Sequence, residues 1–452
     1  MYPTQSISDK IKLFIRIVIP ILITQVGIYF MNVFDTVMAG QASAEDLAGV
    51  AVGSSIWVPV LTGTNGILIA ISPITAQLLG AGEKDLIPYK VKQGLYLAAA
   101  ITVTILIAGV LFLDSILNLL ALEPDVRHIA KYYLVALGYG MIFLFSFNLL
   151  RSFIDALGQT KTSMLIILMT LPLNALFNYM FIFGRLGAPE LGGIGAGIAS
   201  ALAYMISSIV AVMIIHRVMP FRRYYIFHTW GKPSLQAWRE QLTIGLPIGV
   251  TIFFETSIFA AVTLMISRYD TYTVAAHQAA MNYATIFYML PLAIAMALTI
   301  AVGFEVGGKR MQDAKQYSLI GISSGLTVAL VSGAFIFFLR EEVAQLYSDH
   351  PEVITLMQQF LVFAVFFQIS DGFGTPIQGA LRGYKDVNVT LVIAFISFWV
   401  IGLPSGIAMS AWTSLDAFGY WVGLIVGLAV GAMILIGRLF YIIRRYDQKQ
   451  QI

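Results

Sequence analysis

Three acidic residues lie inside apolar stretches of this chain: Asp35 in YFMNVFDTVMAG, Glu255 in GVTIFFETSIFA and Asp371 in VFFQISDGFGTP. A carboxylate at the centre of a lipid bilayer costs at least about 2.5 kcal/mol on insertion scales. Membrane proteins keep such groups where they face a cavity and bind ions or protons. The three acids therefore indicate a transporter, and they are where we expect its ion-coupling chemistry.

Two asparagines are spaced so that they can join Asp35. Asn174 and Asn178 are four residues apart, so they share one face of a helix, and we expect them at a depth similar to that of Asp35. One carboxylate and two amide carbonyls offer hard oxygen ligands for a small cation such as Na⁺. The same groups could instead hydrogen-bond a protonated acid, or form an interhelical clamp worth about 1 kcal/mol.

Glu255 and Asp371 both belong to the second half of the chain and could meet within one group of helices. Two carboxyl groups in proximity can exchange H⁺, or can hold Na⁺ when both are ionised. No basic residue is expected at their depth, so a structural ion pair is not the expected role. Aromatic and polar side chains on neighbouring stretches could line a cleft for flat, lipophilic cations, because aromatic faces attract cations; they are Phe253, Phe254, Phe259, Gln278, Asn282, Tyr283, Tyr288, Phe366 and Phe367.

The amino-acid composition indicates which class of protein contains these residues. The chain has 452 residues, of which 58% are hydrophobic and 11% charged, whereas soluble domains contain roughly 25% charged residues. We therefore expect an all-α polytopic membrane protein. The absence of cysteine excludes disulfides, thiolate metal sites and cysteine nucleophiles.

Twelve apolar stretches are long enough to cross the ~30 Å hydrocarbon core as helices. They fall near residues 13–38, 47–79, 93–121, 129–155, 162–184, 193–216, 241–267, 274–304, 317–339, 353–379, 388–411 and 418–443. With both termini in the cytoplasm, 22 of the 27 Lys and Arg residues lie on the inner side. The positive-inside rule therefore predicts that orientation.

The two halves of the chain repeat each other. Pro20 in VIPILIT and Pro247 in GLPIGVT are 227 residues apart, and so are Gly80 and Gly307. Each half holds six predicted helices, an even number, so both copies enter the membrane in the same direction and form parallel repeats around a central cleft. The predicted domains are a first lobe at 1–220, a basic cytoplasmic linker at 221–238 and a second lobe at 239–452.

The order of these motifs resembles that of the multidrug and toxic compound extrusion (MATE) transporters. The resemblance covers essentially the whole chain and includes VFDTVMAG around Asp35, the LAGVA segment, AAHQAA at 275–280 and the loops ALGQTK and ALRGYKD. Glu255 and Asp371 together resemble the NorM-like branch rather than the DinF-like one. The resemblance implies two lobes in a V shape and the export of cationic drugs and dyes in exchange for Na⁺ or H⁺.

The resemblance also implies roles for individual residues. It assigns the ion site of the first lobe to Asp35, Asn174 and Asn178 and that of the second lobe to Glu255 and Asp371, with Na⁺ a candidate at either. Some members have Asp where this chain has Asn178, and a Thr ligand where it has Ala196, which leaves protonation of Asp35 open. The expected substrate contacts, drawn from the resemblance and from the aromatic set, are Ser55, Phe259, Gln278, Tyr283 and Phe367.

The sequence thus predicts a monomeric antiporter of the bacterial inner membrane, with small cationic substrates and no nucleic-acid partner. It is expected to be no enzyme and to need no cofactor besides its coupling ion. The alternatives are a lipid-linked saccharide flippase of the same superfamily, an intramembrane enzyme and a channel. A flippase would need a cationic cleft for pyrophosphate, an enzyme would need a nucleophile or metal set, and a channel is not favoured by the repeat.

Overall fold

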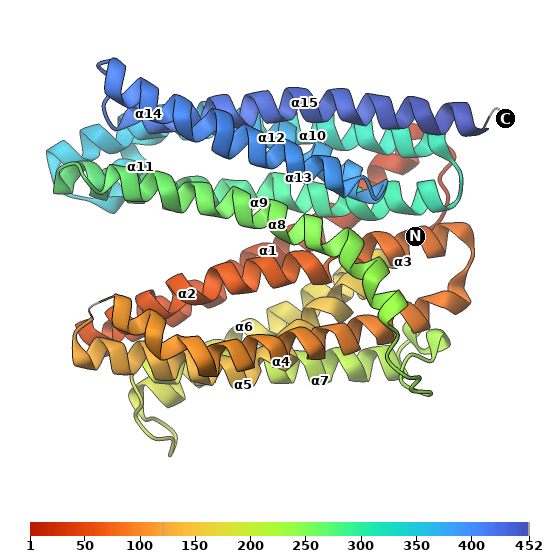
Figure 1. Ribbon diagram of the computed structural model, residues 1–452, viewed down its shortest axis with the longest axis horizontal. Coiled ribbons are helices and arrows are strands. Elements are labelled where there is room, and N and C mark those ends of the chain that lie inside the picture. Colours follow the sequence, from red (N-terminus) through yellow and green to blue (C-terminus); the bar gives the residue numbers. More distant parts are fainter. Residues whose placement is uncertain (121, 451–452) are drawn as a thin grey trace. The chain divides into compact units, whose positions relative to one another are not determined.

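The computed structural model describes residues 1–120 and 122–450, which are almost entirely helical and include no strand (Figure 1). Short 3₁₀ turns occur at η1 (Lys84–Leu86) and η2 (Phe221–Tyr224), and η3 (Ile396–Gly402) is a π-helix. The α-helices are α1 (Ile7–Ala42), α2 (Ala44–Leu68), α3 (Ile71–Ala81), α4 (Ile87–Leu119), α5 (Pro124–Ala156), α6 (Thr160–Phe183), α7 (Gly193–Arg217), α8 (Leu235–Ile266), α9 (Thr271–Gly307), α10 (Met311–Phe338), α11 (Arg340–Tyr347), α12 (Pro351–Gly383), α13 (Val387–Phe395), α14 (Leu403–Trp412) and α15 (Phe418–Gln450).

The predicted all-α class and the twelve spans are confirmed. Within the described residues, twelve helical stretches are long and apolar enough to cross a membrane. Three of these spans are composite: Ala44–Ala81 contains α2 and α3, Lys84–Leu119 contains η1 and α4, and Val387–Trp412 contains α13, η3 and α14. Between the spans, the chain has the residues that commonly start and stop helices.

Helix ends follow local hydrogen bonding and backbone preference. Ser43 caps α2 by accepting a hydrogen bond from the Asp46 backbone nitrogen at 2.9 Å. Asp270 caps α9 and accepts hydrogen bonds from the hydroxyl and backbone nitrogen of Thr273, which hold the pKa of Asp270 below its ordinary value. Gly82 and Gly184 follow α3 and α6 with φ of 79° and 63°, a left-handed conformation that glycine adopts without strain.

The chain divides into two compact units, each with its own core. One unit, the 23–249 unit, contains Ile23–Gly249, and its core includes Phe145, Phe147 and Phe153 from α5. The other unit, the C-terminal unit, contains Met1–Leu22 together with Val250–Ile452. Its cores include Leu298 from α9 and Trp421 from α15.

The first residues of the chain pack within the C-terminal unit. Lys10 is buried and pairs with Asp313 at 2.9 Å, and the hydroxyl groups of Thr4 and Tyr317 lie 3.1 Å apart. The boundary between the units therefore falls inside α1, between residues 22 and 23, and again inside α8, between 249 and 250. The predicted lobes, 1–220 and 239–452, describe the two copies of the repeat and stay a prediction. The contacts divide the chain differently, because they group residues 1–22 with the second half.

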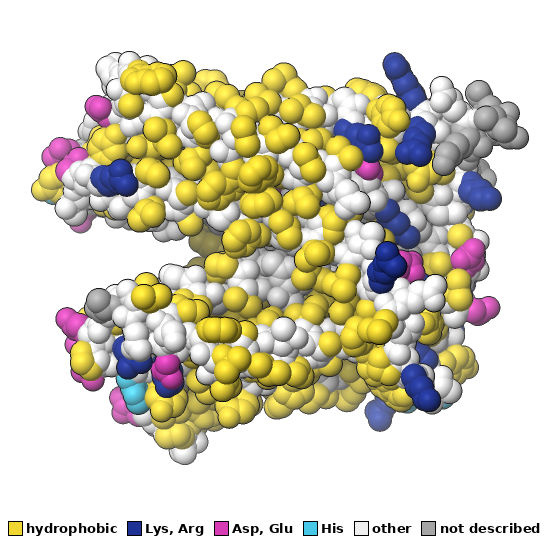
Figure 2. Space-filling view, viewed as in Figure 1, with side chains coloured by type: hydrophobic (Ala, Val, Ile, Leu, Met, Phe, Trp, Pro, Cys, Tyr) yellow, Lys and Arg dark blue, Asp and Glu magenta, His cyan; other side chains and the backbone are white. Residues whose placement is uncertain are grey.

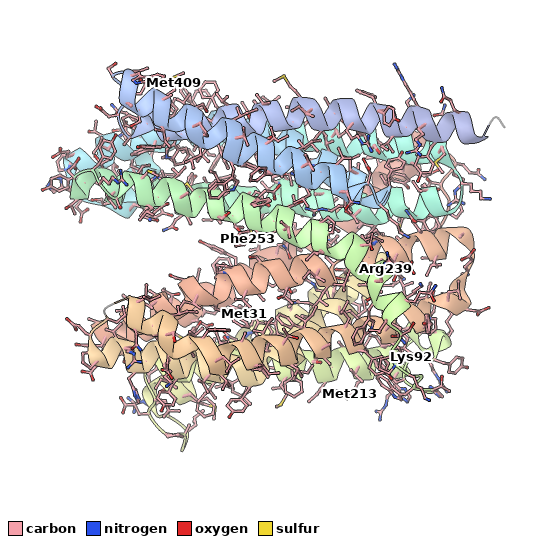
Figure 3. All side chains as sticks on the ribbon, viewed as in Figure 1. Met31, Lys92, Met213, Arg239, Phe253 and Met409 are labelled. Carbon is pink, nitrogen blue, oxygen red and sulfur yellow. The ribbon has the colours of Figure 1, made fainter. Side chains whose placement is uncertain are left out.

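The predicted linker belongs to the 23–249 unit and is hydrogen-bonded to α4. Lys92 of α4, labelled in Figure 3, donates to the Thr229 carbonyl at 2.6 Å. Its neighbour Gln93 donates to the Lys232 carbonyl at 2.9 Å, and Tyr96 donates to the Gly231 carbonyl at 2.7 Å. The linker is therefore fixed along one side of α4 rather than being a free tether.

The outer surface of each unit is strongly apolar. On the face shown in Figure 2, hydrophobic side chains cover the lengths of the helices, and Lys and Arg gather mainly near helix ends. Leu111 on α4 is 64% exposed and Phe338 on α10 is 75% exposed. Exposed apolar surface of this extent is unfavourable in water and suits contact with lipid.

Candidate functional site

The structure brings Asp35, Asn174 and Asn178 together in the 23–249 unit. Asp35 lies on α1, and the two asparagines lie one turn apart on α6. The amide nitrogens of Asn174 and Asn178 donate to Asp35 Oδ1 at 3.2 and 2.7 Å. Ser200 of α7 donates its hydroxyl to Asp35 Oδ2 at 2.6 Å. All four side chains are buried, so three helices hold one carboxylate.

This arrangement surrounds Asp35 with donors. Both carboxyl oxygens of Asp35 accept hydrogen bonds from these side chains. Asn178 Oδ1 is buried without a hydrogen-bond partner, so one amide oxygen remains available to a further ligand. The site therefore keeps one unpaired amide oxygen near Asp35 for an incoming ion, water or proton donor.

Close packing of α6 against α7 positions these donors. A Cβ atom added at Gly195 of α7 would lie 2.4 Å from the Phe181 carbonyl oxygen of α6. No side chain fits in that space, so glycine permits the approach that places Ser200 near Asn174. Ala196, noted in the sequence as a missing threonine ligand, is one turn before Ser200, which supplies the hydroxyl instead.

Gly195→Ala is expected to destabilise the protein by about 1–3 kcal/mol, because backbone atoms of α6 must move to admit the methyl group. The thermal midpoint of the detergent-purified protein, measured by size-exclusion chromatography after heating, should fall. Gly109→Ala on α4 is the matched control, because no atom lies within 4 Å of its added Cβ. Equal midpoints for the two variants would contradict the proposed packing role.

A second candidate site is a cavity of about 330 Å³ inside the C-terminal unit. Glu255 of α8 and Asp371 of α12 both line it, as do the aromatic rings of Phe259 and Phe367, which pack edge to face with centroids 5.6 Å apart. Most of the remaining lining is apolar. The polar lining residues are Glu255, Thr256, Thr285, Tyr288, Asp371, Thr375, Gln378 and Ser397.

Some polar oxygens of this cavity have hydrogen-bond partners and others do not. Gln378 donates to Glu255 Oε1 at 2.6 Å, and Thr375 donates to Asp371 Oδ1 at 2.8 Å. Asp371 Oδ2 and Ser397 Oγ are buried and have no partner. Unpaired buried oxygens are costly, and two carboxylates with a free hydroxyl form an oxygen-rich set suited to a hard cation.

A buried base lies one side chain away from Glu255, and the sequence alone did not indicate it. Arg382, on the last turn of α12, is buried, and its guanidinium donates to Gln378 Oε1 at 3.4 Å. Gln378 in turn donates to Glu255 Oε1 at 2.6 Å, so one amide links the arginine to that acid. The sequence places Arg382 at the end of an apolar stretch, where exposure to water was the simpler expectation, but the arginine lies inside the helix packing.

The π-helix η3 shapes one wall of the cavity through Ser397 and Phe398. Two glycines of α15 allow η3 to pack closely against this helix. A Cβ at Gly427 would lie 2.6 Å from the Ser397 carbonyl oxygen, and one at Gly431 would lie 2.8 Å from Ser397 Oγ. Trp399 donates from Nε1 to the Phe254 carbonyl on α8 at 3.3 Å. π-helical turns often occur at functional sites.

Two of the predicted substrate residues line this cavity. Phe259 and Phe367 line the cavity beside the acids. Gln278 is exposed on α9. Tyr283 packs edge to face with Phe287, with ring centroids 5.2 Å apart, and neither Gln278 nor Tyr283 is among the lining residues. Ser55 belongs to the 23–249 unit, is exposed and donates to the Ala51 carbonyl at 2.8 Å.

The family model MatE matches the chain twice, at residues 20–180 and 247–407. The two matches start 227 residues apart, the offset between Pro20 and Pro247, and so confirm the predicted repeat. The repeat also relates the two unit boundaries, which each follow one of these prolines by two residues. Pro20 and Pro247 lie within α1 and α8, where proline disturbs helix geometry.

Close relatives match the chain from end to end. A probable multidrug resistance protein NorM from Oceanobacillus iheyensis is 57% identical over 442 residues, which cover 98% of this chain and 99% of that protein. A protein of the same description from Bacillus subtilis (strain 168) is 53% identical and covers 100% of both chains. These identities extend through both halves.

Solved structures share the fold at much lower identity. An outward-facing multidrug resistance MATE family transporter of the MOP superfamily has a TM-score of 0.89, with 20% identity and 99% of each chain covered. The eukaryotic MATE transporter AtDTX14 has a TM-score of 0.87 at 16% identity, covering 98% of this chain and 99% of that one. Together with the family match, these findings place the chain in the MATE family, a family of membrane transporters rather than enzymes, and in its NorM-like branch.

Proposed function

We propose that the protein is a multidrug efflux antiporter that exports cationic, lipophilic drugs and dyes in exchange for Na⁺ or H⁺ by alternating access. The observation that carries the proposal is the cavity in which Glu255 and Asp371 lie beside the rings of Phe259 and Phe367. The acids attract a cation, and the rings offer a surface for a flat apolar one. The descriptions of the NorM relatives support the same substrate class.

The acids divide into two coupling sites in this proposal. Asp35 with Asn174 and Asn178 forms one, and Glu255 with Asp371 forms the other. Binding of the coupling ion neutralises negative charge and so lowers the affinity for a cationic drug. Exchange then requires that ion and drug differ in affinity for the two conformations, because equal binding shifts no equilibrium.

The same proposal places the protein in the bacterial inner membrane as a monomer with both termini in the cytoplasm, as the distribution of Lys and Arg predicts. A lipid-linked saccharide flippase is less well supported, because a pyrophosphate group would meet two carboxylates in the cavity of the C-terminal unit. The polar groups of that cavity favour positive charge.

Ethidium export tests the proposal in cells that lack their own efflux pumps. Expression of this protein should speed ethidium loss, and an inward gradient of Na⁺ or of H⁺ should be required for it. Varying Na⁺ at constant pH, and pH at constant Na⁺, separates the two coupling ions. Export that continues in proteoliposomes without any ion gradient, but with ATP, would contradict antiport.

A further inference from the structure

Arg382 is a buried cation with no acid directly paired to it. Its side chain is 7% exposed on the last turn of α12, within an apolar span. Among the described residues, no ion pair within 4.0 Å includes Arg382. A guanidinium stays charged in proteins, so burying one requires compensation from nearby charge or hydrogen bonds.

The compensation comes through Gln378. Arg382 donates from Nη2 to Gln378 Oε1 at 3.4 Å, and Gln378 donates from Nε2 to Glu255 Oε1 at 2.6 Å. The amide therefore has its oxygen toward the positive charge and its nitrogen toward the negative one. Hydrogen bonds arranged in such a chain polarise one another and are strengthened in a medium of low dielectric constant.

Apart from Glu255, Asp371 is the only charged residue among those that line the cavity. Gln378, Asp371 and Tyr288 line the cavity, whereas Arg382 is not among its lining residues. The arginine therefore lies behind the cavity wall, where it can act on Glu255 but not contact an ion inside the cavity.

The other unit is built differently. Arg151 of α5 is also buried, but the acid that acts on it is Asp155, one turn away on the same helix. Asp35 accepts hydrogen bonds from three neutral side chains. A link from carboxylate through amide to guanidinium is thus a property of the cavity site.

We propose that Arg382 is an internal counter-cation of the cavity site and competes, through Gln378, with the coupling Na⁺ for the charge of Glu255. This inference rests on the proposed function and adds a residue that sets ion affinity. When Na⁺ leaves, the arginine keeps part of the negative charge neutralised. When Na⁺ is bound, repulsion from the arginine weakens its binding and so speeds release.

Na⁺ binding to the purified full-length protein provides the main test. In a scintillation proximity assay with ²²Na⁺, Arg382→Gln should lower the half-saturating Na⁺ concentration by about fivefold, because a nearby positive charge has been removed. Arg382→Lys keeps the charge and should stay near the wild-type value. Arg445→Gln removes an exposed arginine of the same unit and should leave binding unchanged.

Ethidium export adds a second measurement. At saturating Na⁺, Arg382→Gln should export more slowly than wild type, because the more tightly bound ion leaves more slowly. If Arg382→Gln does not fold, Gln378→Leu keeps the arginine but removes the amide that donates to Glu255 Oε1. It should also lower the half-saturating Na⁺ concentration, because that carboxylate oxygen is then free for the ion.

Several outcomes would overturn the inference. Wild-type Na⁺ affinity in the folded Arg382→Gln or Gln378→Leu variant would do so, as would equal changes in Arg382→Gln and Arg382→Lys, which would indicate a packing role. Absence of Na⁺ binding to the wild-type protein overturns it as well. Na⁺ binding that responds to Arg382 in a protein that exports no drug would instead overturn the proposed function and leave the inference standing.

Discussion

Asp35→Asn is expected to reduce ion-driven ethidium export to near background while the protein stays folded. The substitution keeps the size of the side chain but removes the charge that accepts hydrogen bonds from Asn174, Asn178 and Ser200. The new amide also has an NH₂ group in place of one carboxylate oxygen. That NH₂ group faces a hydrogen-bond donor, so the contact at that position becomes unfavourable. A loss of about 1.4 kcal/mol in ion binding already corresponds to a tenfold weaker affinity.

Export from inverted or whole-cell preparations measures this effect, and the amount of folded protein must be measured in the same samples. Asp125→Asn is the matched control, because Asp125 is an exposed acid in the first turn of α5 in the same unit. It should export at the wild-type rate. Normal export by a well-folded Asp35→Asn protein would remove Asp35 from the coupling site.

Asp371→Asn is expected to raise the half-saturating Na⁺ concentration by about tenfold or more, since roughly 1.4 kcal/mol of lost binding is a factor of ten. Asp371 Oδ2 is buried without a partner and lies beside the cavity. The variant keeps a hydrogen-bonding group for Thr375 but offers no negative charge to the ion. Its effect on Na⁺ is opposite in sign to that of Arg382→Gln.

Binding of ²²Na⁺ and Na⁺-driven ethidium export both measure this change. Asp349→Asn, an exposed acid between α11 and α12, is the control and should bind Na⁺ as the wild type does. An unchanged Na⁺ response in Asp371→Asn would show that the cavity carboxylates do not bind the coupling ion. Export that then depends on H⁺ alone would assign coupling to the proton.

Hydropathy and residue spacing were sufficient to predict the membrane-spanning helices and the repeat. Each span is a long run of apolar residues. Comparing the length of each run with the thickness of the bilayer core shows which runs can cross the membrane as helices. Asn174 and Asn178 could be placed on one face because the helical period is local. The structure places that face against Asp35, a contact between residues far apart in the chain.

Other site residues could not be predicted from periodicity. Ser200, Gln378 and Arg382 join their sites through the rotation and depth of neighbouring helices, which a single sequence does not reveal. Ser200 had one available signal, since it lies one turn from Ala196 on the same helix. Arg382 comes at the end of its apolar stretch, a position that alone indicates a basic residue at the membrane edge.

The first 22 residues have a consequence for dissecting the protein. They pack within the C-terminal unit, held by Lys10 and Asp313 among other contacts, while the start of α8 packs within the 23–249 unit. A chain severed in the linker would thus yield two fragments, each without a helical segment that packs within its own unit. Neither fragment is self-sufficient, and a working protein from such a pair requires that they exchange these helical segments.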